Sequence, residues 1–349
     1  MDWQIAAILA QDGVTSGAVY ALLALALVLV FSVTRVIFIP QGEFVSFGAL
    51  TLAGIQSGVA PQLTWMLIAM GSLAFLMDLG VTLRHGRRRN PRGVLLSSGI
   101  RFLVFPVALH FLVNALPLAT MGMLWQALLA MLIVTPMGPM LYRIAYQRLS
   151  EASTLVLLIV SVAAHFLLTG VGLLVFGAEG SRTKAFSEAS FELSGVQLTG
   201  QALSVVAISI LLIIVLYLFF DRSLTGKALR ATAVNRSGAR LVAIGASDAG
   251  KLAFTLAAAI GALSGVLIGP ITTIFYDSGF LIGLKGFVGA IVGGLASYPV
   301  AAAGAILVGL LVSYSSFWAS AFKEVIVFTL IIPVLLWRSL ASPHADEEH

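Results

Sequence analysis

The stretch "TSGAVYALLALALVLVFSVT", residues 15–34, contains twenty consecutive residues without a charged side chain. A helix of this length rises about 30 Å, which matches the hydrocarbon thickness of a bilayer. The stretch has no polar face, so a helix formed by it needs apolar surroundings on every side. It therefore predicts a membrane-spanning helix.

The rest of the chain has the same character. Of its residues 59% are apolar and only 10% are charged, and the mean hydropathy is +1.04. A soluble domain carries about 25% charged residues. Ten further apolar stretches follow the first: 43–60, 64–83, 95–116, 121–142, 154–175, 200–220, 252–275, 285–297, 300–318 and 323–337. The stretch 285–297 is too short for a standard crossing and predicts half of a broken or re-entrant helix. We expect an all-α polytopic transmembrane helical bundle of about 11 spans, including short or broken helices.

The positions of the basic residues predict the orientation, because cytoplasmic loops are rich in Lys and Arg. One arrangement places 16 of the 20 Lys and Arg residues in the cytoplasm, in segments that include 84–92 and 222–251. It leaves four outside: Arg182, Lys184, Lys285 and Lys323. The N-terminus is then outside and the C-terminus cytoplasmic. Segment 177–200 becomes an external loop with a weak strand signal, and 339–349 a disordered cytoplasmic tail.

Several classes of site are not expected. The chain has no cysteine, and its five histidines lack metal-ligand spacing, so we predict no disulfide and no metal or other cofactor. The clustering of cations in loops indicates topology rather than nucleic-acid binding. Ser264 and His165 could be imagined as a protease dyad, but no G-x-S-G motif surrounds the serine. No catalytic residue is predicted.

The stretch "GASDAGKL", residues 245–252, differs by one residue from the nucleotide-binding motif G-x-x-x-x-G-K-[ST]. Leu252 replaces the hydroxyl that would hold magnesium, and a basic segment rather than a buried strand precedes the motif. We therefore expect no ATP binding by this chain.

The loop 221–251 mixes basic residues with many small ones. The pattern predicts two short helices with a kink near residues 235–238. Two interpretations stay open: a basic helix lying on anionic lipid, and a docking element for a cytoplasmic partner.

Small residues recur every four positions at Ala257, Gly261, Gly265 and Gly269, a pattern that lets membrane helices pack closely. Gly293 continues this theme in the short span. Helix packing is the main interpretation. Lining of a translocation path is the alternative for Gly265 and Gly293.

Polar residues inside spans are costly and therefore informative. Glu43 follows the helix-breaking "IPQG" and is predicted at the cytoplasmic boundary, where it favours the start of a helix. The alternative places Gln41 and Glu43 in a translocation path. His165 predicts an interhelical hydrogen bond, and Asp78 is expected to face Arg101 across a hairpin.

Several segments together resemble the permeases of the branched-chain amino acid ABC transporter family. They are "DGVTSGAVYALLALALVLVFSVTRVI" with "GEF", "GKALRATAVNRSGARLVAIGASDAGKLAFTLAAAIGALSGVLIGP", "GFLIGLKGFVGAIVGGLASYP" and "FKEVIVFTLIIPVLLW". The resemblance covers residues 12–60 and about 121–338. It implies an inner-membrane permease domain over 1–338, without enzymatic activity of its own.

The resemblance also implies partners. These are a second permease subunit in a homo- or heterodimer, two cytoplasmic ATPase subunits and an external solute-binding protein, besides membrane lipid. The segment 221–251 matches the family's cytoplasmic coupling loop, which docks on the ATPase. The positions carried over to this coupling role are Gly226, Arg230, Ala231, Asn235, Ala239 and Gly245.

Two departures from the family concern cargo and topology. Residues 38–41 read Phe-Ile-Pro-Gln where the family has Asn-Phe-Ala-His, so a change of cargo follows if those groups touch the solute. Residues about 62–120 have no clear counterpart and predict an inserted hairpin of two spans. Branched-chain amino acids or a related small polar solute are the expected cargo. The alternative, a stand-alone secondary transporter or channel, would need buried ion-coupling charges and inverted repeats.

Overall fold

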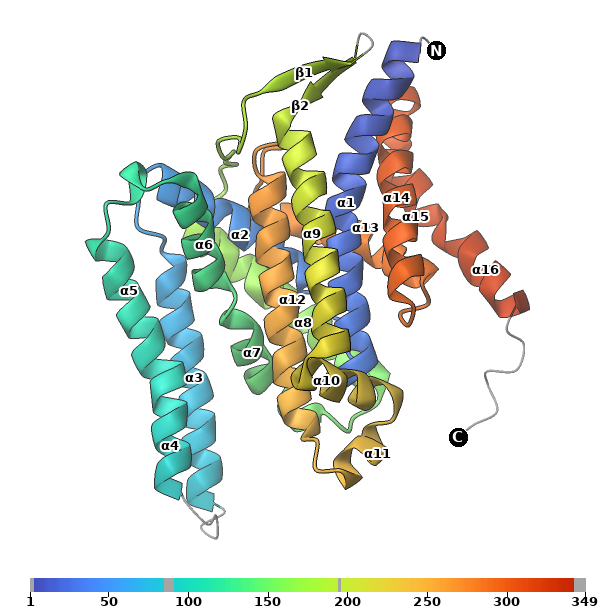
Figure 1. Cartoon of the computed structure of the whole chain (residues 1–349). Coiled ribbons are helices and arrows are strands. Elements are labelled where there is room, and N and C mark those ends of the chain that lie inside the picture. Colours follow the sequence, from blue (N-terminus) through green and yellow to red (C-terminus); the bar gives the residue numbers. More distant parts are fainter. Residues whose placement is uncertain (1–2, 85–90, 194–195, 342–349) are drawn as a thin grey trace.

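The computed structural model describes residues 3–84, 91–193 and 196–341, and is almost entirely helical (Figure 1). The longer helices are α1 (Trp3–Thr34), α2 (Gln41–Gln56), α3 (Leu63–Arg84), α5 (Phe105–Ala115), α6 (Met123–Val134), α8 (Thr154–Phe176), α9 (Gly200–Arg222), α12 (Ala246–Ile268), α13 (Ser278–Val292), α14 (Tyr298–Trp318) and α16 (Ile331–Ala341). The shorter ones are α4 (Pro91–Gly99), α7 (Met137–Leu141), α10 (Leu224–Val234), α11 (Arg236–Leu241) and α15 (Lys323–Thr329). The tail 342–349 and residues 85–90 of the basic segment lie outside the described residues.

The expected all-α polytopic bundle is confirmed. Within the described ranges, nine helical segments are long and apolar enough to cross a membrane. Two of the eleven predicted spans fall short, because α2 has 16 residues and α13 has 15. The short α13 was expected. The full span predicted over 43–60 is wrong, because α2 ends at Gln56 and begins inside the bundle.

The start of α2 lies at mid-height of the bundle. After α1, residues 35–40 run back into the interior without helical structure. The amide Nε2 of Gln41 then donates to the carbonyl of Ala257, the middle residue of α12, at 3.0 Å. Pro40 immediately precedes the helix and disfavours a helical conformation at Ile39. The chain therefore crosses this half of the bundle as an extended segment.

The start of α13 lies beside the start of α2. The helix α12 ends at Ile268, so the predicted span 252–275 was too long, and α13 begins only at Ser278. A Cβ on Gly42 would collide with the backbone of Gly279, and one on Gly283 would lie 2.9 Å from the Cα of Gly42. Only glycine permits backbones to approach so closely. The first turns of two short helices are thereby packed together.

The irregular segment 269–277, between α12 and α13, pairs with the loop before the β-strands. Ser181 and Ile274 exchange two backbone hydrogen bonds of 2.9 Å, and Thr183 N–H donates to the carbonyl of Gly269. The guanidinium of Arg182 donates to two further carbonyls of the segment. These contacts supply partners to backbone groups that lie outside any helix.

Helix α1 is the centre of the molecule. Every residue from Gly17 to Val30 is buried, and α1 packs against α9, α12, α13 and α14 (Figure 1). Most of the charge-free stretch 15–34 is therefore enclosed by other helices of the protein rather than by lipid.

The two ends of the bundle differ. The strands β1 (Ser190–Leu193) and β2 (Val196–Thr199) form an antiparallel hairpin at the end where α1 begins, which we call the β-hairpin end (Figure 1). Helices α10 and α11 lie at the opposite end, which we call the α11 end. The weak strand signal in 177–200 thus corresponds to a short hairpin.

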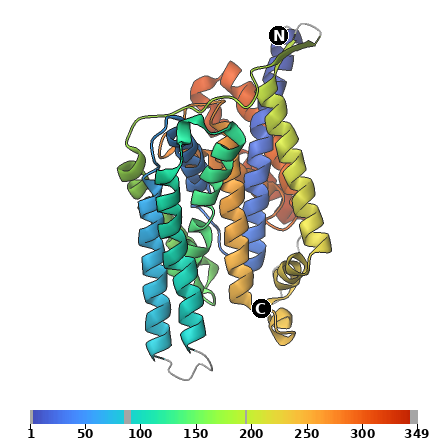
Figure 2. The same ribbon diagram turned by 60° about the vertical axis from the view of Figure 1, so that its left-hand side comes forward.

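The described residues 62–84 and 91–120 form two helical arms that lie side by side at the edge of the bundle (Figures 1 and 2). Helix α3 packs against α4, α5 and the π-helix η1 (Ile100–Val104) between them, and it reaches the body through α6, α7 and the π-helix η3 (Tyr142–Tyr146). The expected pair of spans is present, with a wide turn of backbone in its second helix.

We predict that Gly48→Ala lowers the free energy of unfolding by about 1–3 kcal/mol, because its Cβ would lie 2.5 Å from the carbonyl oxygen of Ala262 on α12. The matched control is Gly170→Ala in α8, where a Cβ meets nothing within 4 Å. That change should be neutral or stabilising by up to about 1 kcal/mol. Thermal unfolding in detergent measures both, and equal midpoints would contradict the close approach of α2 to α12.

Candidate functional site

A buried polar cluster lies where α2 begins. Gln41 and Glu43 are each 1% exposed, and His165, the middle residue of α8, is 7% exposed. Glu43 Oε1 lies 2.6 Å from His165 Nδ1. This hydrogen bond joins α8 to α2. The predicted interhelical hydrogen bond of His165 is confirmed.

Further contacts join α2 and α8 to α13. The ring of Phe280 stacks on His165 with 4.4 Å between centroids, and Thr169 Oγ1 lies 3.4 Å from Glu43 Oε1. Ser46 Oγ accepts from the backbone N–H of Gly279 at 2.7 Å, which satisfies one of the free donors at the start of α13. Three helices therefore meet at one set of polar groups.

The location of Glu43 differs from the sequence prediction. It does lie in the first turn of α2, where a negative charge is favourable. That turn, however, is at mid-height of the bundle and not at its cytoplasmic boundary. Pro40 and Gly42 mark the start of a helix inside the protein, which from sequence looks the same as a start at the membrane surface.

The cluster keeps unused hydrogen-bonding capacity. Gln41 Oε1 and Glu43 Oε2 are buried and have no hydrogen-bond partner. An unsatisfied buried acceptor costs about 1–3 kcal/mol. A cavity of about 40 Å³ adjoins Gln41 and is lined by residues of α1, α13 and the segment 37–41. It has room for one water molecule. The arrangement can accept hydrogen bonds from a small donor, and it is closed to anything larger.

The other two path candidates have packing roles. A Cβ on Gly265 would collide with the backbone of Val45, so this glycine lets α12 approach α2 one turn beyond the cluster. Gly293 ends α13 and packs against Ala301 of α14, away from the cluster. The structure thus brings Gln41 and Glu43 together, places Gly265 nearby and leaves Gly293 apart.

The predicted coupling segment forms two short helices, α10 and α11, joined at Asn235. Its side-chain Oδ1 accepts from the N–H of Gly238 at 2.8 Å and caps α11. Gly226 and Ala239 are buried, and a Cβ on Gly226 would collide with the backbone of Phe219. Arg230, Ala231, Asn235 and Gly245 are exposed. The two-helix prediction is confirmed, and its six residues divide into buried and exposed ones.

A shallow groove of about 500 Å³ runs along α10 and α11. Its lining is Lys227, Arg230, Ala231, Val234, Asn235, Gly238, Ala239 and Val242. Leu241 is 89% exposed beside it, and Val234 is 82% exposed. Exposed apolar side chains of this size mark a surface that contacts protein or lipid.

Helix α11 is tied to the segment that precedes α8. Arg236 Nη1 donates to the carbonyl of Ser150 at 2.9 Å, and Arg240 Nη2 donates to Glu151 at 3.0 Å. Ser150 and Glu151 lie a few residues before α8, the helix that carries His165, so the segment bound by α11 leads directly into a helix of the buried cluster. This link joins residues almost 90 positions apart and has no signal in the sequence.

Two partly buried ion pairs were also missed. Lys285, assigned to the outer side from sequence, is 8% exposed within α13 and donates to Glu324 Oε1 at 3.0 Å. Asp78 was expected to face Arg101, but it binds Arg143 and accepts from Ser98 Oγ at 2.7 Å. Among the described residues, no group of three or more His, Cys, Asp or Glu side chains is placed to hold a metal ion.

Three features define a polytopic membrane transport protein. They are many crossing helices, two helices that begin at mid-depth, and a buried polar cluster where those two helices meet. The chain belongs to the family described as "Branched-chain amino acid transport system / permease component", which it matches over residues 9–335. It is accordingly a transport permease component and not an enzyme.

Three relatives carry names of the same kind. The high-affinity branched-chain amino acid transport system permease protein BraD of Pseudomonas aeruginosa is 28% identical over 301 residues, which cover 82% of this chain and 94% of BraD. The protein LivH of Escherichia coli is 26% identical, over 93% of this chain and 91% of LivH. LivH of Salmonella typhimurium is 25% identical over the same shares. No solved structure matches the chain.

We predict that Glu43→Leu and His165→Leu each lower the free energy of unfolding by about 1–3 kcal/mol, because each leaves the other polar group buried without its partner. The double variant should be more stable than the sum predicts, with a coupling of about 0.5–3 kcal/mol. Thermal or denaturant unfolding of the four proteins measures the coupling. Strict additivity would show that the two side chains do not interact.

Proposed function

We propose that the chain is the permease subunit of an ABC importer, and that it carries branched-chain amino acids or a related small polar solute. The family and the names of its relatives support the class of cargo. The observation that carries the proposal is the pair of free buried acceptors, Gln41 Oε1 and Glu43 Oε2, at mid-height of the bundle.

The chemistry of this cluster suits an amino acid. The ammonium group of a solute would donate to Glu43 Oε2 and Gln41 Oε1, which accept nothing else. Its carboxylate would be favoured by the positive ends of α2 and α13, which begin side by side. Leu27, Phe38 and Phe287 line the adjoining cavity and offer apolar contact to an aliphatic side chain.

Transport requires the cluster to open. The cavity of about 40 Å³ is too small for a solute of several heavy atoms, and Gln41 and Glu43 are almost fully buried. The contact between α2 and α13 depends on the glycines at 42, 279 and 283. Separation of these two helices would enlarge the cavity. We therefore assign Gln41 and Glu43 to the translocation path, with Gly265 as a packing residue beside it.

Energy would enter through the groove on α10 and α11. We assign Ala231, Arg230 and Asn235 to the surface that docks on an ATPase subunit, while Gly226 and Ala239 shape the helices beneath. Closure of the ATPases would displace α11, and its hydrogen bonds to Ser150 and Glu151 would pass the motion to α8 and His165. A stand-alone transporter or channel would leave this exposed groove without a role.

The remaining assembly follows from the ends of the bundle. Basic side chains gather at the α11 end, which we place in the cytoplasm of a cell with an inner membrane. The β-hairpin end then faces outward, toward a solute-binding protein, and the N-terminus is external. A second permease subunit, identical or related, and two ATPases complete the importer.

We predict that Ala231→Trp weakens ATPase docking by about 1–3 kcal/mol, because the added ring fills the groove where a partner backbone would lie. Thr225→Trp is the control, since Thr225 is exposed on α10 but outside the groove. Co-purification of the ATPase subunit and solute uptake measure the effect. Full retention of the ATPase by Ala231→Trp would favour the lipid-surface interpretation of α10 and α11, on which tryptophan is harmless.

The orientation can be tested in this cysteine-free chain with single cysteines at exposed positions. Ala189→Cys, beside the β-hairpin, should react with a membrane-impermeant thiol reagent added outside intact cells. Ser237→Cys, on α11, should react only after the membrane is opened. The reverse pattern would invert the topology.

A further inference from the structure

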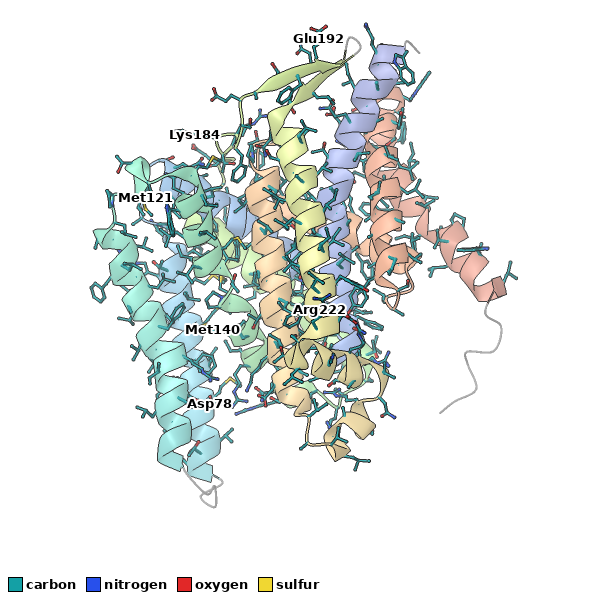
Figure 3. The ribbon with its side chains drawn as sticks, in the orientation of Figure 1. Asp78, Met121, Met140, Lys184, Glu192 and Arg222 are labelled. Atoms are coloured by element: carbon teal, nitrogen blue, oxygen red, sulfur yellow. The ribbon has the colours of Figure 1, made fainter. Side chains whose placement is uncertain are left out.

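A cavity of about 640 Å³ separates the hairpin of residues 62–120 from the body of the bundle. Four elements contribute charged side chains to its wall: Asp78 from α3, Arg101 from η1, Arg143 from η3 and Lys251 from α12. Figure 3 shows Asp78 and Met140, another lining residue, between the hairpin and the body. This cavity is distinct from the Glu43 cluster and takes no part in the proposed transport path.

The cations that line this cavity outnumber the carboxylates that pair with them. The carboxylate of Asp78 is already bound by Arg143 and Ser98. Arg101 makes no hydrogen bond or ion pair with a described residue, although it is exposed toward the cavity. Among the described residues, Lys251 forms an ion pair with Asp248 alone, at 3.3 Å, and the side chain of Asp248 is 83% exposed. Such an exposed pair is weak. Two cations therefore remain available to an anion.

Both cations lie near the α11 end of apolar helices. Arg101 lies six residues into the span Leu95–Ala115, about 9 Å along its helix from the α11 end. Lys251 lies five residues into α12, about 8 Å from the same end. Cations near the ends of membrane-spanning helices attract the head groups of anionic lipids. An arginine facing hydrocarbon alone would be unfavourable, so an anionic partner beside Arg101 would lower that cost.

Much of the remaining wall is apolar, with Val81, Phe102, Phe105, Pro139 and Met140 among its residues, and Ser97, Ser98, Gln147 and Thr255 add uncharged polar groups. A soluble anion would gain nothing from the apolar side chains, whereas an acyl chain would pack against them. Both arginines also lie in π-helical turns, Arg101 in η1 and Arg143 in η3. Such turns are uncommon and frequently occur at functional sites.

We propose that this cavity binds one anionic phospholipid from the leaflet at the α11 end. Its phosphate lies between Arg101 and Lys251, and an acyl chain runs along Phe102, Phe105 and Met140. The lipid joins the hairpin to the base of α12. Without the lipid, the hairpin is connected to α12 through α3 and the elements that α3 contacts. Basic pockets between membrane helices are established binding sites for lipid head groups.

The test uses the purified full chain in detergent, incubated with phosphatidylglycerol or phosphatidylcholine, and native mass spectrometry to count bound lipid. The wild type should retain phosphatidylglycerol in preference to phosphatidylcholine. Arg101→Gln should reduce phosphatidylglycerol retention about fivefold, the effect of one basic side chain near the lipid surface. Lys184→Gln, an exposed cation at the β-hairpin end, is the matched control and should change nothing.

Three results would overturn the proposal. They are equal retention of the two lipids by the wild type, unchanged retention by Arg101→Gln, and displacement of the lipid by excess inorganic phosphate, which would indicate a site for a soluble anion. If Arg101→Gln does not fold, as judged by size-exclusion chromatography, Lys251→Gln replaces it and should show a similar loss.

Discussion

Backbone groups at mid-depth of a membrane protein have no water to bind, and this constraint shapes the centre of the molecule. Helices α2 and α13 both begin there, so their first N–H groups need partners inside the protein. Ser46 provides one for Gly279, and residues 181–183 provide several for the segment 269–277. The loop near the β-hairpin is therefore hydrogen-bonded to the bundle at several points, although its sequence looks like a free surface connection.

The contact between the starts of α2 and α13 determines both the packing of these helices and the surroundings of Glu43. The glycines that let α2 meet α13 also place two helix starts beside Glu43, and the partial positive charge of those starts stabilises its carboxylate. His165 fixes one carboxylate oxygen and leaves the other free. His165 lies on α8, and α11 is hydrogen-bonded to Ser150 and Glu151 in the segment just before that helix, so a displacement at the α11 end would reach this carboxylate through α8.

The sequence predicts what depends on local pattern. Long apolar runs predicted the membrane spans. The stripe of small residues predicted the close packing of α12, and the basic segment around Asn235 predicted two short helices. The depth of Glu43 was not predictable, because a proline and a glycine before a carboxylate are typical of a membrane boundary as well as of an interior helix start. The pairs Asp78–Arg143 and Lys285–Glu324 join distant positions, and only tertiary packing decides that they meet.

The enclosure of α1 has a consequence for biogenesis. Its neighbours α12, α13 and α14 are synthesised more than 200 residues after it. Until they arrive, α1 must remain in the bilayer with lipid against every face that will later touch protein. A helix without a single charge from residue 13 onward tolerates that wait, whereas α2, with its carboxylate and its short length, cannot reach its final depth until the later helices have been inserted.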